Sequence, residues 1–182
     1  MSKAYTKPAY VVHNHFGKET REHPALRFIE ALAQWFDQPD HSNKEDFFVD
    51  SWSIKTPDGE HWDEGLESYE DAIEKFYKGP FAKYKHNVFT LIAIESEDGY
   101  DTYTQANVAA NLTGKAAKGE QKVKDSHGEE WDVLVPVFFH HELVKVPGAP
   151  HEGLKCSHVK IFKDTGVVNA KLEARGEKGS VY

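Results

Sequence analysis

The strongest constraint on the fold is the β-rich character of the chain after Pro80. β-branched and aromatic residues occur there in runs separated by polar or glycine-containing segments, a pattern typical of strands joined by turns. Glu97-Asp98-Gly99 and Asp164-Thr165-Gly166 predict hairpin turns, whereas 114–128 and 147–153 predict polar loops. We therefore expect a largely antiparallel sheet, with strands at 84–95, 100–113, 131–146, 157–163 and 167–173.

Two segments in the first half of the chain have apolar residues at the three- and four-residue spacing of amphipathic helices. The first is predicted to run from Pro24 to about Asp37, and the second to end at Gly79-Pro80. A strand at 52–55 and a turn at 56–59 are predicted between them and indicate a hairpin. The apolar positions are Leu26, Ile29, Leu32, Ala33 and Phe36 in the first helix and Leu66, Tyr69, Ile73, Phe76 and Tyr77 in the second.

The order of these elements predicts an α+β fold in which the helices pack on one face of a curved sheet. Residues 1–23 are polar and lack periodicity, so we expect an N-terminal arm that is ordered only where it docks on the rest of the protein. Residues 24–182 form the predicted domain. A chain of 182 residues is an ordinary length for one domain.

Composition and charge argue against several classes of function. The chain has 22 Lys and Arg against 30 Asp and Glu, a net charge of −8, and no basic cluster, so we expect no nucleic-acid partner. It has no stretch of 18 apolar residues, and its first ten residues lack the apolar core of a signal peptide, so we expect neither membrane association nor secretion. Cys156 is the single cysteine, which excludes an internal disulfide and favours a cytoplasmic protein.

Four segments follow one another in a characteristic order: Phe28-Ile29-Glu30-Ala31-Leu32, the strand and turn 54–59, the helix 69–73 leading to His86 on a strand, and 158–166. In this order and spacing they resemble the NTF2-like superfamily, which includes nuclear transport factor 2, ketosteroid isomerase, scytalone dehydratase and the SnoaL-like polyketide cyclases. The resemblance covers roughly residues 24–173. It implies a cone in which helices pack on the concave face of a curved, mixed or antiparallel sheet.

The resemblance also limits which of the family's reaction mechanisms this chain could use. Phe28, Thr56 and Ser157 stand where ketosteroid isomerases have a tyrosine, a general-base aspartate and an oxyanion-hole carboxyl, so a steroid-isomerase mechanism is excluded. Asp37 and His86 match the aspartate and the pocket histidine of scytalone dehydratase. The other dehydratase positions differ, because Phe36 and Thr56 replace its two tyrosines, Ala110 or Asn111 falls near its second histidine, and Ser157 falls near its asparagine.

A carboxylate that accepts a proton from one imidazole nitrogen fixes the tautomer of the ring and makes the other nitrogen more basic. We therefore expect His86 to be a general acid or base, with Asp37 orienting it, in a cofactor-independent lyase, isomerase or cyclase, similar to a dehydratase, that acts on a small apolar molecule. The alternative is a non-enzymatic NTF2-like module that binds a ligand or mediates assembly. The expected substrate-binding residues are Asn111, Ser157 and Thr56 for an oxygen atom, and Trp52 and Phe36 for the apolar body.

Other histidines lie on the predicted strands. Adjacent strand residues point to opposite faces, so His140 and His141 cannot bind one metal ion from a regular strand. His140 and Glu142 share a face and could be joined by His158 or His151. No known metal-binding spacing is present, so we predict no metal site and place these histidines at the surface or at an interface. Whether the pocket is lined by the row Tyr103, Gln105, Asn107, Ala109 and Asn111 is left open.

The segment 131–146 is apolar on both of its predicted faces. An antiparallel strand with one face in water would be polar at alternate positions. We therefore expect both faces to be covered, and we predict a homodimer that packs through the convex face of the sheet.

Overall fold

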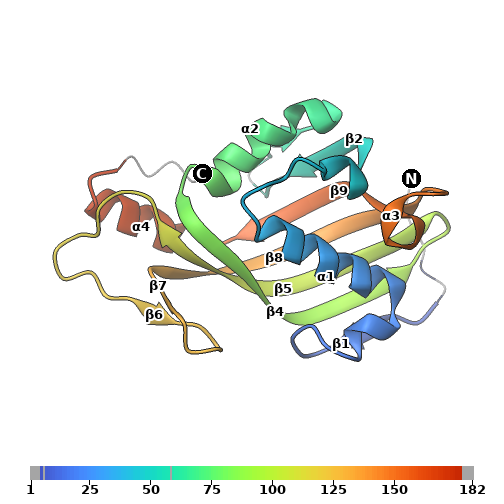
Figure 1. Cartoon of the computed structure of the whole chain (residues 1–182), viewed down its shortest axis with the longest axis horizontal. Coiled ribbons are helices and arrows are strands. Elements are labelled where there is room, and N and C mark those ends of the chain that lie inside the picture. Colours follow the sequence, from blue (N-terminus) through green and yellow to red (C-terminus); the bar gives the residue numbers. More distant parts are fainter. Residues whose placement is uncertain (1–4, 6, 58, 178–182) are drawn as a thin grey trace.

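The computed structural model describes residues 5, 7–57 and 59–177, so Asp58 of the predicted turn and parts of both predicted ranges, 1–23 and 24–182, lie outside the described residues. The described chain forms a curved, mixed sheet with the strand order β1-β4-β5-β8-β9-β2-β3 (Figure 1). Neighbouring strands are antiparallel except for β2 and β9, which are parallel. The strands are β1 (Tyr10–Val12), β2 (Phe48–Lys55), β3 (His61–Trp62), β4 (Phe81–Glu95), β5 (Gly99–Leu112), β8 (Val133–Lys145) and β9 (Leu154–Lys163).

The helices lie mainly on one face of this sheet. In Figure 1, α1 crosses in front of β4, β5 and β8, and α2 lies beside β2. The second predicted helix is irregular, because α2 is preceded by a 3-10 turn, Gly65–Ser68, and followed by a π-helical turn, Glu74–Lys78. The helices are α1 (Pro24–Phe36), α2 (Tyr69–Ile73), α3 (Pro150–Gly153) and α4 (Gly166–Ala174).

The helix α1 forms where its apolar spacing predicts it. Pro24 occupies the first helical position, where its fixed φ is compatible with a helix and no backbone donor is lost. Leu26, Ile29 and Leu32 are buried against the sheet. The apolar stripe therefore fixes which side of α1 faces the strands, and it also places Asp37, directly after the helix, at the sheet surface.

The alternation of buried and exposed side chains along β5 shows which face of the sheet is internal. Thr104, Ala106 and Val108 are buried, whereas Gln105 is exposed and Asn107 is half-buried. The row from Tyr103 to Asn111 therefore lies on the outer face of the sheet. The buried row faces the helices, which is the concave side.

The predicted strand at 167–173 is wrong, and this segment is the helix α4. Val167 and Val168 favoured a strand, but the residues that follow them are good helix formers. Val168 and Leu172, four residues apart, are both buried, as the inner side of a helix requires. The predicted hairpin turn at 164–166 instead leads into this helix.

Two segments without predicted structure join the fold through short strands. Part of the N-terminal arm forms β1, which pairs with β4 at the edge of the sheet. The polar loop after β5 contains β6 (Val123–Lys124), which pairs with β7 (Glu130–Trp131).

The predicted loop at 147–153 contains α3, with His151 and Glu152 at positive φ. Within the described residues, every helix is too short or too polar to cross a bilayer.

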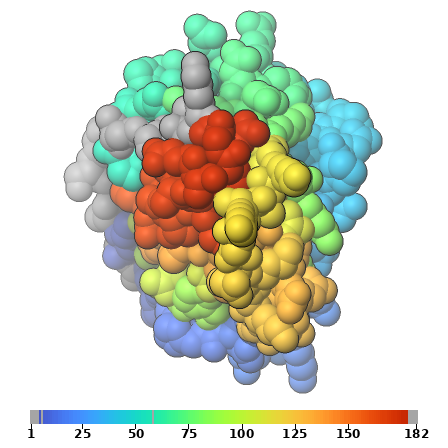
Figure 2. Space-filling model, turned by 90° about the vertical axis from the view of Figure 1, so that its left-hand side faces the viewer, coloured from blue at the N-terminus to red at the C-terminus, as the bar shows by residue number. Residues whose placement is uncertain are grey.

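Arg175, directly after α4, ties this helix to the segment between β5 and β8. Its guanidinium donates to the carboxylates of Glu120, at 2.6 Å, and Asp132, at 2.7 Å, and to the carbonyl oxygens of Leu112 and Thr113. The Arg175 side chain is only 2% exposed. Figure 2 shows α4 in red packed beside the yellow part of this segment. The ion pair lowers the pKa of the Glu120 carboxyl.

Replacing Arg175 with leucine should lower the free energy of unfolding by roughly 3–5 kcal/mol, because it removes the main cation from two carboxylates that are mostly buried. Urea unfolding at pH 7 measures this value. The control is Arg27→Leu, which removes a salt bridge to Glu152 at the surface and should cost about 1 kcal/mol or less. Equal losses in the two variants would contradict the role of Arg175.

Candidate functional site

A mostly apolar cavity lies between α1 and the concave face of the sheet. The space inside it that the centre of a water-sized sphere can reach is small, about 40 Å³. Side chains from α1, β2, β4, β5, β8, β9 and the π-helical turn line it. Most of them are aliphatic or aromatic, which suits a small apolar ligand.

Asp37, His86 and Tyr77 form a hydrogen-bonded chain at the wall of this cavity. Nδ1 of His86 lies 2.7 Å from Oδ1 of Asp37, so the contact expected between these two residues is confirmed. Nε2 of the same ring lies 3.1 Å from the hydroxyl of Tyr77. His86 and Tyr77 line the cavity, whereas Asp37 stands behind His86.

Three segments far apart in the sequence position these three hydrogen-bonded side chains. Asp37 directly follows α1, His86 lies on β4, and Tyr77 lies in the π-helical turn after α2. The carboxylate of Asp37 also accepts the backbone N–H of His86 at 3.0 Å, which holds the end of α1 against β4. The His86 side chain is 6% exposed and that of Asp37 is 21% exposed, so this interaction is largely shielded from water.

The cavity wall also contains polar atoms without a protein partner. Nε1 of Trp52 and Oγ1 of Thr104 are buried, and neither forms a hydrogen bond with any residue that the structure describes. Both residues line the cavity. A buried polar group without a hydrogen bond costs about 1–3 kcal/mol, so these atoms identify a place where a ligand atom would be stabilised.

His141 is the second histidine of the cavity wall. Burial lowers the pKa of His141 to about 3, with smaller contributions from His140 and His86. Its ring is therefore neutral at pH 7. His140, one residue earlier, is on the outer face and contacts Asp101, so the prediction that these two histidines point to opposite faces is confirmed. The expectation that both lie at the surface or at an interface is wrong for His141, which is buried in the cavity wall.

The structure separates the five predicted substrate-binding residues into two groups. Phe36 and Trp52 line the cavity. Asn111 lies on the outer face, where its side-chain oxygen accepts from Lys122. The hydroxyl of Ser157 donates to the carbonyl of Glu142, and that of Thr56 donates to the carbonyl of Glu60 in the turn after β2. These last three side chains lie outside the cavity, so the candidate site does not include them.

Three residues with polar side-chain groups in the cavity wall were not among the predicted site residues. Tyr77 fits the apolar stripe of the second predicted helix, and the π-helical turn that directs it toward His86 has no sequence signal. Thr104 alternates with the polar row of β5, and its place in the cavity depends on which face α1 covers. His141 continues the row of alternate apolar residues on β8 that faces the helices. This row would have identified His141 as a cavity residue once the inner face of the sheet was known.

No protein-family model matches the chain, and no curated protein matches it by sequence. Similarity is found among solved structures. Hexachlorocyclohexane dehydrochlorinase LinA-type3 from Novosphingobium barchaimii LL02 aligns with a TM-score of 0.57 and 12% identity, covering 79% of this chain and 86% of that chain.

Two further structures show the same similarity. An NTF2-like superfamily protein from Salmonella enterica serovar Typhimurium LT2 aligns with a TM-score of 0.53 and 15% identity, covering 78% of this chain and 88% of that chain. The CaMKII hub of S. rosetta aligns with a TM-score of 0.53 and 12% identity, covering 78% and 95%. With the α1-covered, curved mixed sheet, these alignments show that this chain has the NTF2-like fold.

Proposed function

We propose that this protein binds a small, neutral, mostly apolar molecule that carries a hydrogen-bonding oxygen, and that it performs general acid–base chemistry on it as a cofactor-independent lyase, isomerase or cyclase. The observation that carries this proposal is the Asp37–His86–Tyr77 chain at the wall of an apolar cavity. The fold alone does not identify the activity, because proteins of one fold have many different activities.

The geometry suits proton transfer. Asp37 accepts a hydrogen bond from Nδ1 of His86, which leaves the lone pair on Nε2 and stabilises the imidazolium when that nitrogen takes up a proton. Nε2 is the nitrogen that meets Tyr77, so the proton is exchanged either with the tyrosine hydroxyl or directly with a ligand that displaces it. Both arrangements are general acid–base catalysis in a site from which most water is excluded.

The cavity wall supports a neutral ligand with one polar group. The indole N–H of Trp52 can donate to a carbonyl or hydroxyl oxygen, and the hydroxyl of Thr104 can donate or accept. The neutral ring of His141 supplies no charge to balance an anion. Because burying an unpaired charge is costly, a charged ligand is disfavoured in the described cavity.

The alternative is a non-enzymatic module, and both alternatives have a structural neighbour. One neighbour is named as a dehydrochlorinase and another as a hub. A module with a vestigial pocket would fill its interior with side chains such as Trp52 and Phe36. Here Trp52 and Phe36 leave only a small space in the cavity, but His86 borders that space and keeps its hydrogen bonds to Asp37 and Tyr77. This supports the catalytic proposal over the module.

The test of catalysis is isotope exchange. With cyclohexanone and acetophenone as probes in D2O, NMR measures deuterium incorporation at the carbon beside the carbonyl, the step that a general base would catalyse. We expect the protein to accelerate exchange, Asp37→Asn to slow it by about 10- to 1000-fold, and His86→Ala to abolish the acceleration. Probe affinity, measured by ligand-observed NMR, should change little, because orientation and charge matter mainly in the transition state.

The control for that experiment is His61→Gln, which replaces an exposed histidine outside the cavity and should exchange at the parent rate. If the probes bind but the Asp37 and His86 variants exchange them as fast as the parent, the catalytic proposal is rejected and the binding module stands.

The neutral state of His141 predicts a pH dependence of stability. Unfolding restores its ordinary pKa of about 6.5, so between pH 6.5 and 3 the unfolded chain binds a proton that the folded protein does not. The free energy of unfolding should therefore fall as the pH falls through this window. His141→Gln should reduce the slope by up to about 1.4 kcal/mol per pH unit, measured by urea unfolding from pH 7 to 5. An unchanged slope would contradict a neutral His141.

We also propose that the protein forms a homodimer through the outer face of the sheet. Phe162 is 45% exposed there and its ring lies 6.1 Å from that of Phe138, which in turn lies 6.0 Å from Tyr103. Exposed aromatic clusters of this kind commonly mark protein interfaces.

Replacing Phe162 with glutamate should convert a dimer to a monomer at micromolar concentration, because it places a charge inside the proposed interface. Sedimentation velocity measures the outcome. Val123→Glu is the matched control, since Val123 is 38% exposed but lies on β6, in a separate small sheet. A parent protein that sediments as a monomer would refute the dimer.

A further inference from the structure

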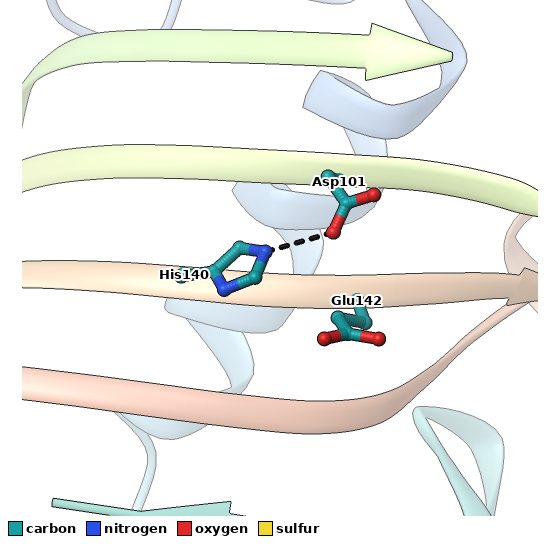
Figure 3. A group of neighbouring side chains, drawn as sticks. All are labelled: Asp101, His140 and Glu142. Carbon is teal, nitrogen blue, oxygen red and sulfur yellow. Dashed lines mark hydrogen bonds and ion pairs between the residues drawn. The ribbon is translucent and has the colours of Figure 1, made fainter. Parts of the chain in front are cut away.

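A second cluster of ionisable side chains lies on the outer face of the sheet, on the opposite side from the cavity. It consists of Asp101 on β5 and of His140 and Glu142 on β8 (Figure 3). One side-chain nitrogen or oxygen from each residue can be chosen so that all three lie within 4.8 Å of one another. None of these residues takes part in the function proposed above.

The strand register brings the three side chains together. Asp101 is the cross-strand partner of Glu142, and His140 precedes Glu142 by two residues and therefore shares its face. In Figure 3, the ring of His140 and the carboxylate of Glu142 project from the same strand, with Asp101 on the neighbouring one. The cluster is thus built on two long, paired strands rather than on loops, which favours a fixed geometry.

Electrostatics favours a cation at this cluster. Carboxylates on directly opposite strand positions repel each other. The side chain of Asp101 is only 1% exposed, so water screens this repulsion poorly. Nε2 of His140, 2.8 Å from Oδ1 of Asp101, provides one partner.

The orientation of the cluster is fixed by its neighbours. The ring of Tyr103 stacks on that of His140, with centroids 4.6 Å apart and planes within 6°. The hydroxyl of Tyr5 hydrogen-bonds to Asp101. These contacts hold a nitrogen of His140 toward Asp101 before any ion binds. Such outer contacts typically accompany metal-binding histidines and carboxylates.

We propose that Asp101, His140 and Glu142 bind a divalent transition-metal ion, for which Zn²⁺ is the best match. One imidazole and two carboxylates are ligands that zinc accepts, whereas Mg²⁺ and Ca²⁺ prefer oxygen alone. Ligand atoms around a tetrahedral zinc ion lie roughly 3.3 Å apart, so small side-chain rotations would close the present arrangement. Three protein ligands leave a coordination position for water. This inference departs from the expectation, drawn from motif spacing alone, that the chain has no metal site.

The ligand set joins two strands, which explains why sequence spacing does not reveal it. His140 and Glu142 alone have the i, i+2 pattern that many strands carry. Asp101 precedes them by 39 and 41 residues, and only the pairing of β5 with β8 adds it. His158, the cross-strand partner of Glu142 on β9, is the nearest further imidazole in the register, with its Nδ1 held by the hydroxyl of Ser53 at 2.7 Å.

The proposal is tested by metal titration of the whole chain, stripped with EDTA and dialysed. Isothermal titration with Zn²⁺ should show one site per chain, and Co²⁺ should give the visible absorption of a coordinated ion. Glu142→Gln and His140→Gln should each weaken Zn²⁺ binding by about tenfold or more. His61→Gln is the matched control, because His61 also has a carboxylate neighbour, Asp63 at 3.7 Å, but lies at the surface away from the cluster.

Thermal unfolding gives a second readout. Zn²⁺ should raise the unfolding temperature of the parent and of the His61 variant, and raise it less in the Glu142 variant, whose side chain is nearly the same shape. Circular dichroism in EDTA establishes that each variant is folded. If His140→Gln does not fold, the Zn²⁺ affinity of Glu142→Gln alone tests the proposal. Absence of a stoichiometric site, or equal affinity of parent and Glu142 variant, would overturn the proposal and leave the contact between His140 and Asp101 as a hydrogen bond within the sheet.

Discussion

The register between β5 and β8 is the constraint on which both faces of the sheet depend. It runs from Gly99 opposite Val144 to Ala110 opposite Val133 without a bulge. Because successive side chains alternate, this register sends Thr104 and His141 toward the cavity and Asp101 and His140 outward. A slip of β8 by one residue would turn His140 and Glu142 toward α1 and His141 outward, which would place a carboxylate under the helix. The apolar residues of the inner row, buried beneath the helices, make such a slip costly.

Much of the fold could be predicted because its determinants are local. The helix α1 follows from apolar spacing, and the long strands follow from β-branched and aromatic runs between turns. Prediction failed at 167–173, where two valines at the start of the segment outweighed the helix formers after them, and burial of Val168 and Leu172 on one helix face decided the outcome. Tertiary packing overrode a weak local preference there.

The candidate site was less predictable, because it depends on residues brought together from distant elements. The contact between Asp37 and His86 could be expected, since a resemblance supplied the pairing that spacing could not. Tyr77 could not be distinguished from the apolar residues of its stripe, because its hydroxyl acquires a partner only through the π-helical turn. Asn111 was predicted to bind substrate but lies on the outer face of the sheet. The alternation of side chains along a strand defines two faces, but it does not say which face the helices cover.

The position of Arg175 in the chain has a consequence for the order of folding. Arg175 follows Asp132 by 43 residues and Glu120 by 55, so on the ribosome both carboxylates are synthesised well before the guanidinium that pairs with them. Contacts over such separations also carry a large loop-closure cost and form late. We therefore expect the pairing of β4, β5 and β8 to precede the docking of α4, so that a nascent chain has the cavity floor before this end of the molecule is closed.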